Sequence, residues 1–96
     1  MAAVTRIGDA DITHCTSMVR AEGSSDVFAN GKGISRAGDH NTAHLQPPCD
    51  PGTSHASPIT SGSSTVFING KGCGRVGDAI SGCTAVAAGS PDVFAG

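Results

Sequence analysis

The sequence contains little of the material from which a large hydrophobic core is built. Its 96 residues include no Trp, no Tyr and only three Phe, whereas Gly occurs 14 times. Folding of a chain of this length buries only about 60–65% of the surface that the unfolded chain exposes. We therefore expect one domain over residues 1–96 with a thin core, stabilised by cross-links as well as by hydrophobic burial.

The sequence also lacks an excess of positive charge and a long apolar run. Charged residues make up 15% of the chain and the formal net charge is −2, which argues against binding to nucleic acid or to an anionic membrane. No signal peptide or transmembrane helix is expected, so we predict synthesis in the cytoplasm. The four Cys are accordingly expected to be reduced or metal-bound rather than paired in disulfides.

A helical pattern is missing as well. Gly or Pro interrupts almost every stretch that is long enough for an amphipathic helix. The chain is therefore predicted to be all-β, built from short strands and turns.

What the sequence does contain is a threefold internal repeat. The phrase Arg-x-Gly-Asp occurs three times, and five positions after each Asp stands a residue that can bind a transition metal. A second phrase, Gly-Ser-x-x-Val-Phe, occurs three times in the same order, at residues 23–28, 62–67 and 89–94, with Thr or Asp before Val. Three copies of one structural unit are expected. The copies of the first phrase are Arg6-Ile7-Gly8-Asp9 with His14, Arg36-Ala37-Gly38-Asp39 with His44, and Arg75-Val76-Gly77-Asp78 with Cys83.

Two copies of the second phrase run into an Asn-Gly pair, at Asn30-Gly31 and at Asn69-Gly70. Asn-Gly between two short β-prone runs indicates a hairpin, because a type I′ turn needs positive φ at both central positions. The third copy ends at Gly96, where the turn is due, while Ala3-Val4 at the start resembles the strand that follows such a turn. We expect the two termini to pair and close the third unit, giving a pseudo-threefold ring without open sheet edges.

The spacing of the copies reveals one insertion. Arg6 and Arg36 are 30 residues apart, whereas Arg36 and Arg75 are 39 residues apart. The additional nine residues lie within about 45–58, which holds four of the five Pro and is predicted to be an ordered surface loop. This loop also carries His55.

The spacing of the repeat and its one insertion predict a metal centre. Structural zinc favours four tetrahedral ligands drawn from Cys and His, and the repeat supplies three of them at equivalent positions. The insertion supplies the fourth. The predicted site holds one Zn²⁺ per chain on His14, His44, His55 and Cys83. Cys15, next to His14, and Cys49, in the inserted loop, stay open as alternative ligands.

The remaining chemically active residues have structural interpretations. Cys73 is expected to be a small buried hydrophobe, and His40 to be exposed or to support the metal ligands. A Cys15–Cys49 disulfide is conceivable but has no support in the sequence. The repeated Asp residues are expected to accept hydrogen bonds from nearby backbone N–H groups in turns and to pair with the repeated Arg residues.

Taken together, these phrases resemble the PAAR-repeat proteins, the small tips of contractile injection machines such as type VI secretion systems and phage tails. The resemblance covers nearly the whole chain. The family's named tetrapeptide, Pro-Ala-Ala-Arg, is degenerate here and keeps only Arg6, Arg36 and Arg75.

The resemblance implies a cone of short β-hairpins with zinc near its vertex. It also implies a non-enzymatic role, in which the base caps a trimeric β-helical spike, one tip per trimer, and the vertex faces the target cell envelope. The protein would then end at the tip of a phage tail or leave the cell with the secretion apparatus, with effector or adaptor proteins as further partners. The residues expected to contact the spike are Val27, Phe28, Val66, Phe67, Val93 and Phe94.

Two other functions compete with this one. A small zinc-braced or disulfide-braced binding module of another kind would use the same cross-links without a spike. A zinc hydrolase would need water at one coordination position and an Asp as general base, but four protein ligands leave no open position.

Overall fold

The structure, a computed structural model, describes residues 1–46, 49 and 53–96. These residues contain no helix, so none of them forms a helix that could span a membrane, and the all-β prediction is confirmed. Short strands alternate with turns and isolated bridges. The strands are β1 (Ala2–Ala3), β2 (Phe28–Ala29), β3 (Lys32–Gly33), β4 (His44–Leu45), β5 (Ser54–His55), β6 (Phe67–Ile68), β7 (Lys71–Gly72) and β8 (Phe94–Ala95).

Both predicted Asn-Gly hairpins are present. Strand β2 pairs antiparallel with β3, and β6 pairs antiparallel with β7. Asn30 and Gly31 have φ of 55° and 76°, and Asn69 and Gly70 have φ of 54° and 79°. These are the left-handed conformations that a type I′ turn requires, which is why Asn and Gly occupy the two central positions.

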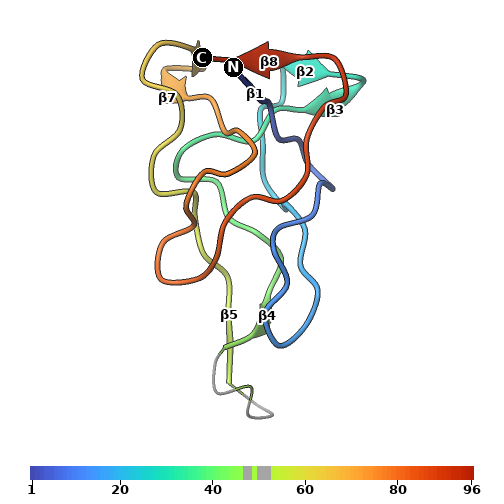
Figure 1. The fold of residues 1–96 in the computed structure, drawn as a ribbon, viewed down its shortest axis with the longest axis vertical. Helices are drawn as coiled ribbons and strands as arrows, with labels where there is room; N and C mark the ends of the chain where they lie inside the picture. The colour runs from blue at the N-terminus through green and yellow to red at the C-terminus, as the bar shows by residue number, and fades with distance from the viewer. Residues whose placement is uncertain (47–48, 50–52) are drawn as a thin grey trace.

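The two ends of the chain form a further strand pair. Strand β1 lies antiparallel to β8, with Ala2 opposite Ala95 and Ala3 opposite Phe94. Both termini therefore lie at the same end of the molecule (Figure 1). The predicted pairing of the termini is confirmed.

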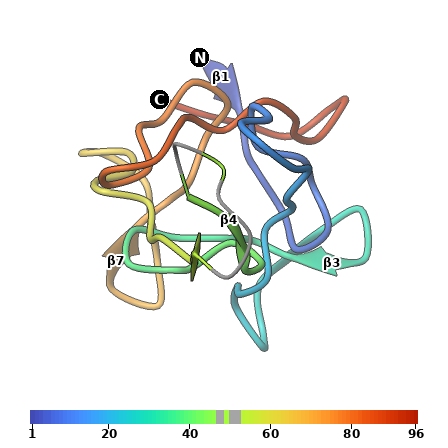
Figure 2. The same ribbon diagram turned by 90° about the horizontal axis from the view of Figure 1, so that it is seen from below.

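The molecule is elongated and tapers toward one end. Its principal extents are 37 × 23 × 21 Å. The pairs β1–β8, β2–β3 and β6–β7 lie at the wide end, while β4 and β5 lie toward the narrow end (Figure 1). Seen along the long axis, β1, β3 and β7 lie on three sides of β4 (Figure 2).

The three copies of the repeat make equivalent hydrogen bonds. In each copy the Arg backbone N–H and guanidinium bind the Asp carboxylate, so the predicted turn and ion pair are both confirmed. The Gly of each copy donates its N–H to a carbonyl 2.9 Å away on a later segment. The residues that provide these three carbonyls are Arg20, Ile59 and Val86.

The core is divided into two small apolar clusters. The first joins the hairpins of the wide end, and the second is a group of three residues, Ile59, Ile80 and Val86, against which Cys83 packs. The larger cluster consists of Val4, Ala29, Ile34, Ile68, Cys73 and Ala95. Neither cluster contains an aromatic side chain, in agreement with the thin core expected from the composition.

The inserted segment differs from the prediction of a loop. Strand β4, at the start of this segment, pairs antiparallel with β5 inside it, with His44 opposite His55 and Leu45 opposite Ser54. Residues 47–48 and 50–52 of the predicted loop lie outside the described residues. The sequence does not predict this strand pair, because the segment lacks an Asn-Gly turn and is rich in Pro. The two strands form because they pair with each other beside the metal ligands, and not because of a local preference for strand.

Candidate metal centre

Four side chains converge at the narrow end of the molecule. The β4–β5 register places His44 and His55 directly opposite each other. His14 and Cys83 approach from the first and third copies, and one potential ligand atom from each of the four residues lies within 4.8 Å of the others. The repeat register and the insertion together predicted this group.

The distances within the group are those of donor atoms crowded around one point. The Cys83 sulfur lies 2.9 Å from His14 Nε2 and 3.2 Å from His44 Nε2, and the two Nε2 atoms are 3.1 Å apart. The three imidazole rings meet edge to face, with centroids 4.4 to 5.3 Å apart. A single cation could contact all four residues from the space between them.

The hydrogen bonds of the rings leave suitable lone pairs for a cation. His44 Nδ1 lies 2.7 Å from the carbonyl oxygen of Thr42, so Nδ1 carries the proton and donates a hydrogen bond. The lone pair of Nε2 is then free to bind a metal. His55 Nε2 is buried and has no hydrogen-bond partner among the described residues. A buried imidazole nitrogen without a partner is costly, and a metal ion would satisfy it. The residues present therefore fit a metal ion.

The site also shifts the protonation of its own groups. Burial, followed by the proximity of His44 and His14, lowers the pKa of His55, so its imidazole stays neutral and able to bind a metal. Burial raises the pKa of the Cys83 thiol. A metal would displace that proton, because a coordinated cysteine is a thiolate.

The expectation that Cys15 and Cys49 are free or metal-bound is wrong. They form a disulfide with a Cα–Cα distance of 5.4 Å, inside the usual range. Their sulfur atoms are therefore not available as alternative ligands. Sequence reasoning missed the pair because the two residues are 34 positions apart and approach only when the inserted segment folds back toward His14.

Removing this disulfide should lower the stability of the protein. A cross-link that closes a loop of 34 residues restricts the unfolded chain and contributes about 4 kcal/mol in the chain-entropy model. We expect the double variant Cys15→Ser/Cys49→Ser to unfold at a clearly lower urea concentration than the oxidised wild type, with metal retained. An unchanged midpoint would show that the disulfide adds nothing.

Two other predicted residues lie outside the metal centre. His40 is exposed and its Nδ1 lies 3.0 Å from a carboxylate oxygen of Glu22, which confirms the exposed interpretation. Cys73 is completely buried in the wide-end cluster, as expected.

The residues predicted to contact a partner lie at the opposite end of the molecule. In each Val-Phe pair the Phe is the more exposed residue: Phe28, Phe67 and Phe94 are 56%, 59% and 50% exposed. Val66 and Val93 are each 36% exposed, and Val27 packs partly against the wide-end cluster. The sequence could not decide which member of each pair points outward.

Three buried polar residues beside the centre were not predicted from the sequence, namely Asp11, Arg20 and Asn41. Asn41 is hydrogen-bonded to the backbone N–H of Ser57 and contacts the Cys83 sulfur. A signal was present, because Asp11 and Asn41 stand two positions after the repeated Asp, where the third copy has Ile80.

Comparison with known families supports the resemblance seen in the sequence. The family model described as PAAR motif matches residues 50–96. This segment contains His55, Cys83 and the third Arg-x-Gly-Asp copy, and residues 1–49 contain the two earlier copies. A search of curated proteins found no match.

Proposed function

We propose, from the fact that this chain belongs to the PAAR-repeat proteins, that it is the non-enzymatic tip of the central spike in a contractile injection machine. PAAR-motif proteins fit a spike-tip role in such machines and associate with a spike protein. The finer proposal is that the wide end caps the blunt end of a trimeric β-helical spike. The narrow end then points toward the target cell envelope.

The observation that carries this proposal is the set of exposed phenylalanines at the wide end. Phe28, Phe67 and Phe94 occupy equivalent positions of the three Val-Phe phrases, and each stands on a strand of a different pair, β2, β6 or β8. Exposed apolar side chains gathered at one end of a chain with few aromatics favour a protein interface. One chain with three such positions could meet three identical partner chains.

The metal centre serves a mechanical purpose in this proposal. We assign one Zn²⁺ to His14, His44, His55 and Cys83, because zinc accepts mixed imidazole and thiolate ligands without redox chemistry. The ion would link segments from all three copies near the narrow end. A thin tip under axial force is stiffened by such a link, since its apolar clusters are small.

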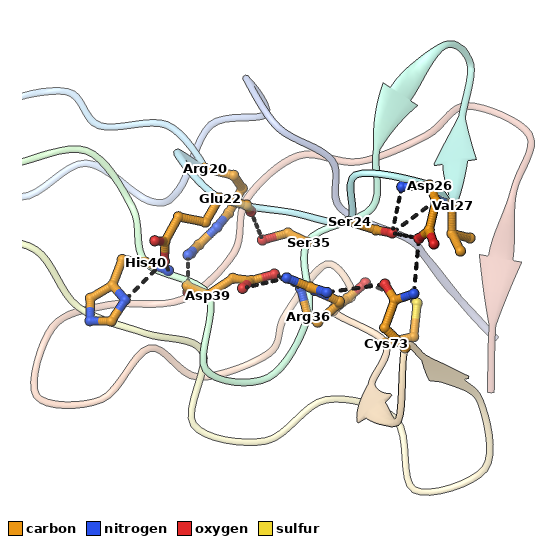
Figure 3. A network of polar contacts seen from close by, with 12 residues as sticks. Arg20, Glu22, Ser24, Asp26, Val27, Ser35, Arg36, Asp39, His40 and Cys73 are labelled. Atoms are coloured by element: carbon orange, nitrogen blue, oxygen red, sulfur yellow. Dashed lines mark hydrogen bonds and ion pairs between the residues drawn. The ribbon is translucent and has the colours of Figure 1, made fainter.

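Polar contacts between copies add support at the wide end. Arg6 Nη1 donates to Asn30 Oδ1, and Asn30 Nδ2 donates to Asp92 in the third copy. The equivalent chain runs from Arg36 to Asn69 and on to Asp26, and Figure 3 shows Arg36 paired with Asp39 beside it. These bonds join neighbouring units side by side and hold the three hairpins in fixed relation, as a docking base requires.

The test is the stoichiometry of a complex with the cognate spike. The full chain and the spike protein are mixed and separated by size exclusion with light scattering. We expect one copy of this chain bound to three spike chains. Separate elution of the two proteins at micromolar concentration, or a complex with three copies of this chain, would contradict the proposal.

A further inference from the structure

One layer of the core, next to the metal centre, is divided into an apolar half and a polar half. Six residues form this layer through three bridges, Asp11 to Val86, Arg20 to Asn41 and Ile59 to Ile80. The apolar half is the cluster Ile59, Ile80 and Val86, against which Cys83 packs. The polar half is Asp11, Arg20 and Asn41, which are only 2%, 0% and 2% exposed and which we call the polar sector.

The polar sector occupies positions that are apolar in other copies of the repeat. Asp11 and Asn41 correspond to Ile80, since each stands two residues after the repeated Asp. Arg20 corresponds to Ile59 and Val86, since the N–H of each binds the carbonyl oxygen of the repeated Asp in its copy. The chain itself therefore shows that apolar side chains can fill this layer.

Burying charge here is costly and only partly compensated. Arg20 Nη1 lies 3.0 Å from Asp11 Oδ2, and both side chains are fully buried. Arg20 Nη2 donates to the backbone carbonyl of Asp39, a contact visible in Figure 3. Asp11 Oδ1 and Arg20 Nε have no hydrogen-bond partner among the described residues. A buried ion pair of this kind is often less stabilising than well-packed apolar residues, so stability alone does not account for it.

The contacts of Asn41 connect the ion pair to the metal centre. Its Oδ1 accepts a hydrogen bond of 2.9 Å from the Ser57 N–H, and its Nδ2 donates to Asp11 Oδ2 at 3.1 Å. These two bonds fix which side of the amide carries the NH₂ group. The same Nδ2 lies 4.0 Å from the Cys83 sulfur. Arg20 forms an ion pair with Asp11, Asp11 accepts a hydrogen bond from Asn41, and Asn41 directs an N–H toward the Cys83 sulfur.

We propose that the polar sector is a positioning device for the metal ligand Cys83, with Asn41 as the residue that donates to its thiolate and the Asp11–Arg20 pair as the support that orients Asn41. This inference rests on the metal site of the proposed function. Removal of a residue that orients a metal ligand typically lowers the metal affinity roughly 10–100-fold. An N–H near the sulfur also lowers the energy of its lone pairs, which changes the spectrum of a bound metal.

The experiment loads the full chain with Co²⁺, whose thiolate charge-transfer band reports directly on the sulfur. Two variants are compared with the wild type. Asn41→Leu removes the amide, and with it the donor to the sulfur, but keeps the Asp11–Arg20 pair. The triple variant Asp11→Ile/Arg20→Val/Asn41→Ile replaces the whole sector by residues like those of the apolar half, and we expect it to fold because no buried charge is left without its partner. Ile59→Val is the matched control, because it trims the apolar half of the same layer, against which Cys83 packs, without removing any hydrogen-bond donor near the sulfur.

We expect both variants to bind Co²⁺ about 10–100-fold more weakly than the wild type in a competition titration. The charge-transfer band should move to longer wavelength. Without a hydrogen-bond donor the sulfur lone pairs lie higher in energy, so the transfer of an electron from sulfur to the metal needs less energy. Ile59→Val should leave the band in place. A merely structural role for the sector would alter stability without moving the band.

Two results would overturn the inference, and they have different meanings. Wild-type affinity and an unshifted band in the triple variant would show that the polar sector only fills space, and would leave the proposed metal site intact. Failure of the wild type to bind Co²⁺ or Zn²⁺ at all would instead remove the metal site, and with it this inference.

Discussion

Loss of the metal should unfold most of the narrow end and lower the stability of the whole chain by about 10 kcal/mol, the scale on which structural zinc contributes to small domains at neutral pH. Small domains are stable by only about 5–15 kcal/mol, so the metal-free protein should retain little stability beyond that supplied by the disulfide. Thermal unfolding followed by circular dichroism, with and without a strong chelator, measures this effect. Elemental mass spectrometry of the purified chain should give one zinc per chain.

Two ligand variants and one control separate coordination from simple loss of a side chain. Cys83→Ser and His44→Ala should each lose the metal and lower the melting temperature by more than about 20 °C, because roughly 1 kcal/mol corresponds to 4–8 °C in a domain of this size. His40→Ala should behave like the wild type, since His40 is exposed and paired only with Glu22. A wild-type protein that contains no metal and melts identically in chelator would refute the metal centre.

The second large effect concerns the wide end. The triple variant Phe28→Ser/Phe67→Ser/Phe94→Ser should bind the spike at least about a thousandfold more weakly, because buried aromatic residues at the centre of an interface commonly contribute 2 kcal/mol or more each. Its folding should be nearly unchanged, since all three side chains are half exposed in the free chain. Titration calorimetry with the trimeric spike measures the affinity.

The matched control for this variant is Ile12→Ser. Ile12 is another exposed apolar residue, 52% accessible, on the segment that leads to His14 at the narrow end. We expect it to leave spike binding unchanged. Equal loss of binding in both variants would point to a general effect of apolar surface, and full affinity in the phenylalanine variant would place the docking surface elsewhere.

Several features of the molecule could be predicted because they depend on local chemistry or on the repeat. The Asn-Gly turns and the Arg–Asp pairs follow from short phrases whose conformations are nearly independent of their surroundings. The pairing of β1 with β8 followed from the third copy of the repeat, which is divided between the two ends of the chain. The group of metal ligands followed from three equivalent positions of the repeat, His14, His44 and Cys83, and from His55 in the insertion. Its binding of zinc stays a prediction.

Other features could not be predicted because they depend on residues far apart in the chain. The β4–β5 hairpin and the Cys15–Cys49 disulfide arise only when the inserted segment folds against the first copy. Successive residues of a strand point to opposite faces, so sequence alone could not tell that Phe28 points outward while Val27 packs partly against the core.

By itself, then, the sequence determined the all-β class, the turns, the order of the units and the identity of the four candidate ligands, since these depend on local composition, on the repeated phrases and on the one insertion between them. Only the tertiary structure decided which cysteines pair, which apolar side chains remain exposed and how Asp11, Arg20 and Asn41 come to lie beside Cys83. Those outcomes depend on distances between separate copies of the repeat, and such distances are set only when the copies pack together.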